Sequence, residues 1–370
     1  MLSNFVIYEM PAAAHSVAMA AVTCNASSAC CAALAVAKHS GCPAGRWQDE
    51  IAPLLAAARQ ETAANLTYLN VGANKGYNVA ELLQRYHKRG AGPRNSEAWH
   101  RELLKGNPKG MRVKYGCGLC NPCKHPPPSV RYHVPVEVHA IEMVDVNAAA
   151  LRRLFGAFGV PGTVWHLATS NYSGSANYRA APYVGLEHYE LGKGTNRQVA
   201  CSTLDAFAAS RLRQGQTIDL LSIDVEGQDA LVLEGARGLL SSRRVSVLEF
   251  EFIARGFWRK DHPEQRRLAP VLESLEAFGY RCFWQGEEHA ASGRLAPASG
   301  PHWCDAFQFK GRANLVCSHL PSVLRIFDRL SIMSKPIRLL QTALEAGCRR
   351  GLACARSGRK SVGSLVQIPT

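Results

Sequence analysis

Short apolar runs alternate with longer amphipathic stretches along most of this chain. Runs typical of strands lie at residues 66–71, 136–143, 163–169, 218–223, 245–252, 280–284 and 305–310. Apolar residues three and four apart, typical of helices, lie at 47–62, 78–86, 148–158, 228–240 and 263–278. This alternation predicts an α/β fold with a mostly parallel sheet and helices on both faces. The last two strand runs have no ordinary helix between them, so we expect an antiparallel strand at the sheet edge.

Composition divides the chain into three parts. The chain has 370 residues, 47% of them hydrophobic, which is enough for one large α/β core with appendages. We place this core domain at residues 47–320, between an N-terminal extension at 1–46 and a basic C-terminal tail at 321–370. Residues 88–134 are rich in Pro, Gly and basic residues. We expect them to form an insertion, because structureless loops of this length are rare inside a domain.

The N-terminal extension is rich in Ala, Ser and Cys and has no acidic residue between Glu9 and Asp49. That composition is compatible with an organelle transit peptide or a disordered segment. The apolar run at 16–37 contains polar residues and follows no Lys or Arg, which makes a signal anchor less favoured and a membrane span unfavoured. We therefore expect a cytoplasmic or organellar protein without stable membrane insertion.

The formal net charge of the chain is +14, which suits an anionic partner such as nucleic acid. Much of the excess lies in the tail, however, where residues 335–360 carry seven Lys or Arg against one acid. We interpret the charge as a basic tail and do not favour a nucleic-acid partner.

The thirteen cysteines form no obvious disulfide framework. Cys201, Cys282, Cys304 and Cys317 lie in core-type segments, where buried thiols are common. A second group consists of Cys117, Cys120, Cys123 and His125. Its spacing is compatible with a zinc site, with a disulfide or with free thiols in a loop. Structural zinc is not favoured, because the spacing is tight and no second C-x-x-C pair exists.

The strand at 66–71 leads directly into a glycine turn and a helix. This turn, Gly72-Ala-Asn-Lys-Gly76, is called the Gly loop below, and such a turn can present backbone N–H groups and a helix N-terminus to a ligand. Its G-x-x-x-G spacing lacks the third glycine of the dinucleotide fingerprint. A nicotinamide cofactor is therefore disfavoured.

Polar residues stand at the ends of three further strands. Glu142 ends the second, Thr169 and Ser170 end the third, and Asp224 and Glu226 follow the fourth. Open α/β sheets bind ligands at the carboxyl ends of their strands, so we expect these residues to meet the Gly loop. The alternative for Asp224 and Glu226 is capping of the following helix. The alternative for Glu142 is a solvated strand end.

Five segments resemble the FkbM-type methyltransferases, and they occur in the family's order. They are Tyr68-Leu-Asn-Val-Gly-Ala-Asn-Lys-Gly, Ala140-Ile-Glu, Thr203-Leu-Asp, Asp224-Val-Glu-Gly-Gln-Asp and Leu248-Glu-Phe. The resemblance covers roughly residues 66–87 and 136–320. It implies a Rossmann-like seven-stranded sheet and S-adenosylmethionine as cofactor. Asn70 stands where the family more usually has Asp.

The resemblance also implies roles for individual residues. Asp224 and Glu226 match the acids beside the transferred methyl group, and Glu142 matches the acid that binds the ribose. The residues implied to bind the cofactor are Asn70, Gly72, Ala73, Asn74, Gly76, Glu142, Thr169, Ser170 and Asp224.

Methyl transfer from a sulfonium is an in-line displacement, so positioning does most of the work. An alcohol acceptor must also lose its proton, which a carboxylate or a histidine can accept. Asp224 is our first candidate for this catalytic base and Glu226 the second. Weaker candidates are His166, His188, His302 and His319. A divalent metal held by these acids together with Glu249 is not favoured.

The sequence therefore predicts an S-adenosylmethionine-dependent O-methyltransferase that acts on a hydroxyl of a glycan or a small molecule such as a natural product. We expect residues 88–134 and 171–198 to build the acceptor pocket. The runner-up is a nicotinamide-dependent oxidoreductase, and the non-enzymatic alternative is a catalytically inactive methyltransferase fold that serves as a binding module.

Overall fold

The structure is a computed structural model, and it describes residues 29–38, 46–86, 92–105, 113, 131–179, 183–185, 197–253, 258, 267–286, 295–304, 307–308 and 311–334. Several predictions fall outside these residues: those for the cysteines at 117, 120 and 123, for His125 and His188, for most of the insertion at 88–134 and for the tail beyond 334.

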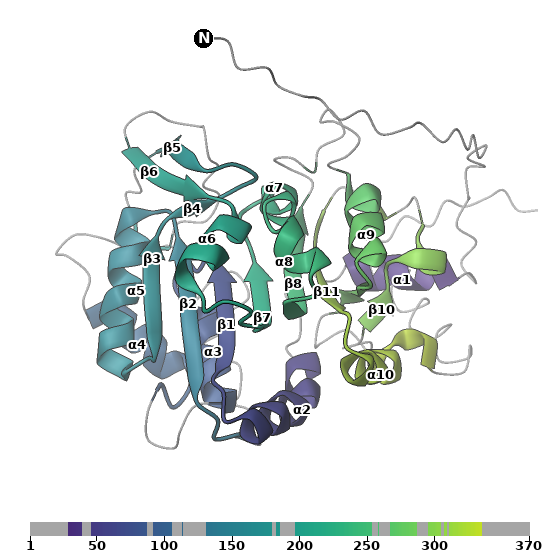
Figure 1. The fold of residues 1–370 in the computed structure, drawn as a ribbon, viewed down its shortest axis with the longest axis horizontal. Helices are drawn as coiled ribbons and strands as arrows, with labels where there is room; N and C mark the ends of the chain where they lie inside the picture. Colours follow the sequence, from purple (N-terminus) through teal and green to yellow (C-terminus); the bar gives the residue numbers. More distant parts are fainter. Residues whose placement is uncertain are drawn as a thin grey trace, which may run out of the picture.

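A large twisted sheet runs through the described part of the chain, with its strands in the order β10-β9-β11-β8-β7-β1-β2-β3 (Figure 1). Neighbouring strands from β8 to β3 are parallel. Their bounds are β1 Leu66–Val71, β2 Val136–Glu142, β3 Gly162–His166, β7 Ile218–Ile223 and β8 Val245–Ile253. Strands β1 and β7 are buried along their whole length, as expected for parallel strands covered on both faces.

The described residues form eight strands in this sheet, one more than the predicted seven. The extra strand, β10 (Leu295–Pro297), pairs antiparallel with β9 (Arg281–Gln285) and makes the expected antiparallel edge. A further antiparallel strand, β11 (Arg312–Ser318), lies inside the sheet between β8 and β9. Of the predicted last strand at 305–310, only residues 307 and 308 are described, and they lie outside the sheet, with Phe307 packed on the rings of Trp284 and Trp303.

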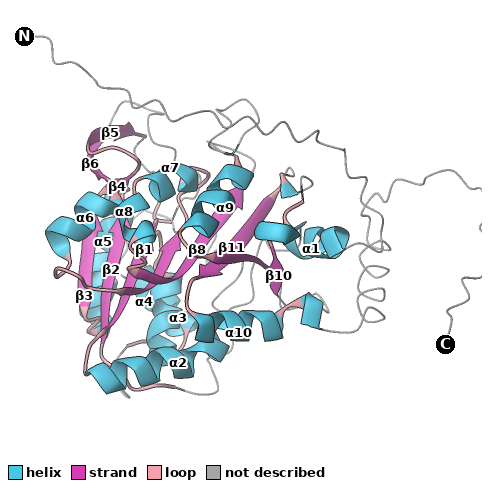
Figure 2. Ribbon diagram, turned by 45° about the vertical axis from the view of Figure 1, so that its right-hand side comes forward, coloured by secondary structure: helices cyan, strands magenta, loops and turns pink. Residues whose placement is uncertain are grey.

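Helices cover both faces of the sheet, as predicted (Figure 2). One face carries α2 Arg46–Thr62, α3 Tyr77–Tyr86, α4 Ser96–Lys105, α5 Asp145–Phe158 and α10 Pro321–Leu330. The other face carries α1 Ala29–Lys38, α6 Leu204–Arg211, α7 Asp229–Glu234, α8 Arg237–Ser241 and α9 Leu268–Ala277. Alternate strand residues supply the two cores: Val247 of β8 packs on the first face and Leu248 on the second. Two short 3-10 helices are η4 Gly300–His302 and η6 Ile332–Ser334.

A smaller sheet stands at the ends of β2 and β3, above them in Figure 1. Its strands are β4 Ala168–Thr169, β5 Gly174–Tyr178 and β6 Arg197–Ser202. The prediction of one strand at 163–169 is therefore wrong at its end. Strand β3 stops at His166, the N–H of Leu167 donates to the carbonyl of Glu142 at 3.1 Å, and Thr169 pairs with β6.

Helix α1 lies within the predicted N-terminal extension, and its apolar side joins the core under β9, β10 and β11. Cys30 of this helix is disulfide-bonded to Cys304, and Cys282 is bonded to Cys317. The prediction of free thiols at 282, 304 and 317 is therefore wrong. Antiparallel pairing of β9 with β11 places Cys282 directly opposite Cys317. Cys201 is a buried thiol, as expected. The boundaries of the three parts of the chain stay a prediction.

Within the described ranges, every helix is too short or too polar to cross a membrane.

Candidate active site

The Gly loop, residues 72–76, joins β1 to α3 at the carboxyl edge of the parallel strands. Gly72 and Gly76 have φ angles of 79° and 76°, a region that favours glycine. The N–H groups of Gly72 and Ala73 both donate to the carbonyl of Ile141, at 2.9 and 3.0 Å, and that of Gly76 donates to the carbonyl of Ala73 at 2.7 Å. These backbone donors thus serve the fold of the loop, contrary to the expectation that they face a ligand.

Gly72 also lets two strand ends meet. A Cβ at this position would lie 1.8 Å from the carbonyl oxygen of Asp224, the residue that follows β7. The N–H of Asp224 donates to the carbonyl of Val71 at 3.0 Å. The missing side chain therefore makes room for the turn after β7, and the Gly loop and Asp224 are in direct contact.

Glu142 ends β2 and is 4% exposed. Its Oε2 accepts the N–H of Asn74 at 2.7 Å, and its Oε1 accepts the N–H of Val144 at 2.8 Å. Burial raises the pKa of Glu142, and these N–H groups oppose that shift. Hydrogen bonds from the Asn147 side chain and the backbone of Met143 act in the same direction. Glu142 therefore orders the Gly loop through several hydrogen bonds to its carboxylate.

Two buried donors at this edge have no hydrogen-bond partner among the residues that the structure describes. Asn70 of β1 is 1% exposed and Thr169 of β4 is 4% exposed. Neither Nδ2 of Asn70 nor Oγ1 of Thr169 has a hydrogen-bond partner in the described part of the chain. Ser170 is buried next to Thr169, and its N–H donates to the carbonyl of Ser202 at 3.2 Å. Buried polar groups are normally paired, so these two donors are exceptions at this edge.

Asp224 and Glu226 lie on the turn between β7 and α7. Asp224 is exposed, and Glu226 has a φ of 56°, in the left-handed region that side chains disfavour. Such strain is found preferentially at functional sites. The N-cap residue of α7 is Gln228, so neither acid occupies that position. The predicted helix at 228–240 is divided into α7 and α8.

Two residues that the sequence did not single out complete this corner. Glu251 lies near the end of β8, and Arg312 begins β11. Nε of Arg312 is 2.9 Å from Oε1 of Glu251, and its Nη2 is 3.7 Å from Oε2 of Glu226. The sequence signal that could have identified Glu251 is the alternation of side chains along β8. It places Glu249 and Glu251 on the same buried face as Val247.

Several carboxyl groups are concentrated around the turn. Burial raises the pKa of Asp229 and that of Glu251 well above the usual range, and the charge of Asp224 raises both further. Arg312 acts in the opposite direction on the pKa of Glu251. Asp229 and Glu251 therefore hold their protons more tightly than carboxyl groups in water do.

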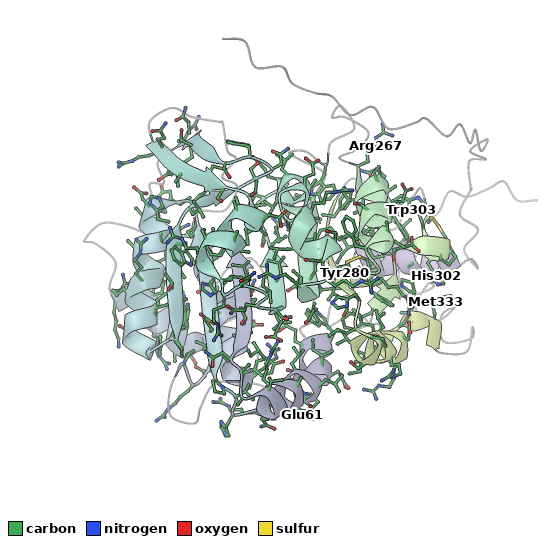
Figure 3. All side chains as sticks on the ribbon, in the orientation of Figure 1. Glu61, Arg267, Tyr280, His302, Trp303 and Met333 are labelled. Atoms are coloured by element: carbon green, nitrogen blue, oxygen red, sulfur yellow. A yellow bond between two sulfur atoms is a disulfide. The ribbon has the colours of Figure 1, made fainter. Side chains whose placement is uncertain are left out.

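The other candidates lie elsewhere. His302 lies beside α1 (Figure 3), and His319 packs against Tyr280 at the amino edge of the sheet. His166 ends β3, where its Nε2 is 3.0 Å from the carbonyl of Met143. Glu249 accepts a hydrogen bond of 2.8 Å from Gln285. In the described ranges, no group of three or more His, Cys, Asp or Glu side chains is placed to hold a metal ion.

Comparisons with solved structures show weak similarity. The methyltransferase FkbM from Methylobacillus flagellatus KT is 12% identical with a TM-score of 0.33, over 68% of this chain and 43% of that one. The SAM-dependent methyltransferase from Agrobacterium tumefaciens is 12% identical with a TM-score of 0.30, over 74% and 62%. The methyltransferase domain of bacterial CtHen1-C is 7% identical with a TM-score of 0.27, over 74% and 98%. The chain thus spans less than two thirds of the first two proteins.

No curated protein is similar enough to count as a match. A family model is more informative, because the methyltransferase FkbM domain matches residues 70–282, more than half of the chain. The matched segment contains the Gly loop, Glu142 and the turn with Asp224. The chain therefore belongs to the FkbM family of methyltransferases.

Proposed function

We propose that this chain is an S-adenosylmethionine-dependent O-methyltransferase whose acceptor is a hydroxyl of a glycan or a small molecule. The observation that carries the proposal is the direct contact between the Gly loop and the turn that bears Asp224. This contact unites the loop, Glu142 and an exposed carboxylate at one edge of the sheet, and family membership supports the same function.

The residues at this edge fit S-adenosylmethionine. Glu142 is a buried carboxylate in direct contact with the Gly loop, and carboxylate oxygens accept hydrogen bonds from ribose hydroxyls. Asn70 and Thr169 offer buried donors without a partner among the described residues. The remaining residues that would line the cofactor are Gly72, Ala73, Asn74, Gly76, Ser170 and Asp224. When bound, this cofactor supplies a methyl group on a positively charged sulfur.

Asp224 is suited to accept the proton of the acceptor hydroxyl. It follows a fully buried strand, which fixes its backbone, while its own side chain is exposed and reachable. A positioned carboxylate that takes a proton in the transition state accelerates such reactions. Glu226 is the second candidate, with Arg312 close to its carboxylate.

Nicotinamide chemistry is less well supported. Dinucleotide sites use a glycine so that a pyrophosphate can approach the backbone closely. Here the space beside Gly72 is filled by the backbone of Asp224. The alternative of an inactive binding module is disfavoured, because the Gly loop, Glu142 and Asp224 are all retained.

Ligand binding tests the proposal without knowledge of the acceptor. We expect S-adenosylhomocysteine to raise the melting temperature of the protein and NAD to leave it unchanged. Glu142→Gln is expected to weaken S-adenosylhomocysteine binding about tenfold, since a hydrogen bond to a charged group contributes about 1.5 kcal/mol. Glu137→Gln, at the other end of the same strand, is the matched control and is expected to bind normally.

Stabilisation by NAD alone would overturn the proposal, and no response to either ligand would favour the binding module. A screen of glycans and small alcohols with methyl-labelled S-adenosylmethionine then identifies the acceptor. Label transferred only to nitrogen or carbon would contradict O-methylation.

A further inference from the structure

Four carboxylates meet at the carboxyl ends of β7 and β8, and we call them the acid corner: Asp224, Glu226, Asp229 and Glu251. Oδ2 of Asp229 accepts the N–H of Gly227 at 3.2 Å, and its Oδ1 accepts the N–H of Glu251 at 3.4 Å. The acid corner is thus held together through the backbone of the turn and of β8.

Arg312 is a partial counter-charge for the acid corner. Its guanidinium contacts Glu251 at 2.9 Å and Glu226 at 3.7 Å. After burial, the charge of Asp224 is the largest influence on the pKa of Glu251, and it exceeds the opposing influence of Arg312. Arg312 thus offsets only part of the rise that burial and the charge of Asp224 cause in the pKa of Glu251.

An unpaired oxygen points to a ligand. Glu251 is 3% exposed, and its Oε2 has no hydrogen-bond partner among the described residues. Burying a carboxylate oxygen without a partner is costly, so such an atom calls for a compensating group. On the neighbouring side of β7, Nδ2 of Asn70 is buried and likewise unpartnered in the described chain.

The acid corner adjoins the Gly loop. Asp224 touches Gly72, and Glu251 lies on β8, the strand next to β7. Charges a few ångströms apart interact more strongly inside a protein than in water, because the effective dielectric constant is lower there. A ligand held at the Gly loop is therefore within the field of the acid corner.

We infer that Glu251, together with Asp224 and Asp229, makes this site selective for ligands that carry positive charge at the position of the transferred methyl group. The acid corner favours the sulfonium form of the cofactor and disfavours its neutral thioether product. This inference rests on the proposed function, because it needs a cofactor at the Gly loop.

Isothermal titration calorimetry with two probes tests this selectivity. Sinefungin carries an amine in place of the methyl sulfonium, and S-adenosylhomocysteine carries no charge at that position. We expect sinefungin to bind about tenfold more tightly at neutral pH and low salt. Glu251→Gln is expected to abolish most of this ratio while S-adenosylhomocysteine still binds.

Glu249→Gln is the matched control. Glu249 lies two residues earlier on the same buried face of β8, but Gln285 donates to it at 2.8 Å. We expect this variant to retain the full preference for sinefungin. A preference that falls equally in both variants would overturn the inference, because it would show a general effect of β8 acids.

Proton release gives a second readout on the unmodified protein. A cation beside Glu251 and Asp229 lowers their raised pKa values, so sinefungin binding is expected to release protons at neutral pH. Titrations in buffers of different ionisation enthalpy measure this release, and S-adenosylhomocysteine is expected to release none. Equal affinities and no proton release would overturn the inference and leave the proposed function intact. If neither probe binds, the proposed function fails, and the inference fails with it.

Discussion

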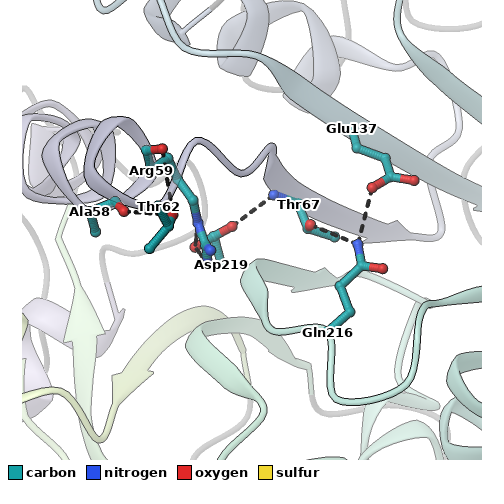
Figure 4. Close-up of polar contacts among 7 residues, drawn as sticks. All are labelled: Ala58, Arg59, Thr62, Thr67, Glu137, Gln216 and Asp219. Atoms are coloured by element: carbon teal, nitrogen blue, oxygen red, sulfur yellow. Dashed lines mark hydrogen bonds and ion pairs between the residues drawn. The ribbon is translucent and has the colours of Figure 1, made fainter.

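The two edges of the parallel sheet use the same kinds of polar residue in opposite ways. At the amino edge (Figure 4), Asp219 begins β7 with its neighbours in place: Nε of Arg59 donates to its Oδ1 at 2.8 Å, and the N–H of Thr67 donates to its Oδ2 at 2.7 Å. Nε2 of Gln216 lies 3.0 Å from both Thr67 Oγ1 and Glu137 Oε2. The polar network at this edge links α2, β1, β2 and β7.

The carboxyl edge differs in its buried polar atoms. Asp224 follows β7 and is exposed, and Asn70, Thr169 and Glu251 each bury a polar atom that has no hydrogen-bond partner in the described residues. Asp219 lies in β7 and Asp224 directly follows that strand, and Asp219 belongs to the network of Figure 4. The network around Asp219 thus serves the fold, whereas we propose a ligand-binding role for Asn70, Thr169 and Glu251 at the carboxyl edge.

The largest expected effect comes from Asp224. We predict that Asp224→Asn lowers kcat/KM about 1,000-fold with an identified acceptor, because the base is lost. The neutral ligand S-adenosylhomocysteine should still bind within about twofold of the wild-type affinity. Radiolabelled methyl transfer and calorimetry measure the two quantities.

Asp205→Asn is the control for that variant. Asp205 belongs to another segment that resembles the family, but its oxygens accept the N–H groups of Gly238 and Leu239 at 2.7 and 2.8 Å. Loss of this cap should cost about 1 kcal/mol of stability and leave turnover unchanged. Survival of turnover in Asp224→Asn would remove Asp224 as the base.

Substitution of Asp219 should reduce stability and leave ligand binding unchanged. We predict that Asp219→Ala lowers the free energy of unfolding by about 3 kcal/mol, because it leaves Arg59 and the N–H of Thr67 without their shared partner. Affinity for S-adenosylhomocysteine in the folded variant should be unchanged. Urea denaturation measures the loss, and Asp328→Ala is the control, since the exposed Arg281–Asp328 pair should contribute less than about 1 kcal/mol. A loss for Asp219→Ala no larger than for Asp328→Ala would contradict this view of the amino edge.

The sequence predicted the parts of the site that depend on local structure. The Gly loop and the helix after it follow from an apolar run and two glycines with positive φ, all within one short segment. Glu142 and Asp224 were also found from sequence, because each directly ends or follows a strand whose apolar pattern is clear.

The missed features depend on contacts between distant segments. Arg312 lies beside Glu251 only because β11 inserts between β8 and β9, a strand order that no local pattern encodes. Cys30 and Cys304 are 274 residues apart, and only the packing of α1 on the sheet brings them together. Thr169 was assigned to the wrong strand, because the chain leaves β3 after His166 and enters the smaller sheet.

Glu249 lies on β8 between the two edges and provides a pH test. Burial raises its pKa from 4.5 to about 7, although the hydrogen bond from Gln285 opposes the shift. Because the folded-state pKa exceeds the unfolded one, the folded state binds more protons in this window, and stability falls as pH rises through it. Relative to Glu249→Gln, the wild type should lose about 2 kcal/mol of stability between about pH 5 and about pH 7. Urea denaturation at several pH values measures this difference. Parallel stability profiles for the wild type and Glu249→Gln would show that the pKa of Glu249 is not raised in the folded protein.

The smallest expected effect gives the most direct comparison of the edges, because it applies one substitution to each. Thr67 and Thr169 are both buried, at 1% and 4% exposure, but only Oγ1 of Thr67 has a partner in the described chain, Gln216 Nε2 at 3.0 Å. Thr67→Val should therefore cost about 1 kcal/mol of stability and leave ligand affinity unchanged.

Thr169→Val should do the opposite. Removal of the Thr169 hydroxyl breaks no hydrogen bond within the described chain, so the free energy of unfolding should stay the same or rise slightly. The affinity for S-adenosylhomocysteine should fall about threefold. Urea denaturation and calorimetry on both variants give the four values needed. If Thr169→Val destabilises the protein as much as Thr67→Val and leaves affinity unchanged, its hydroxyl serves the fold. The carboxyl edge would then resemble the amino edge at this position, and the unpartnered atoms there would no longer indicate a ligand.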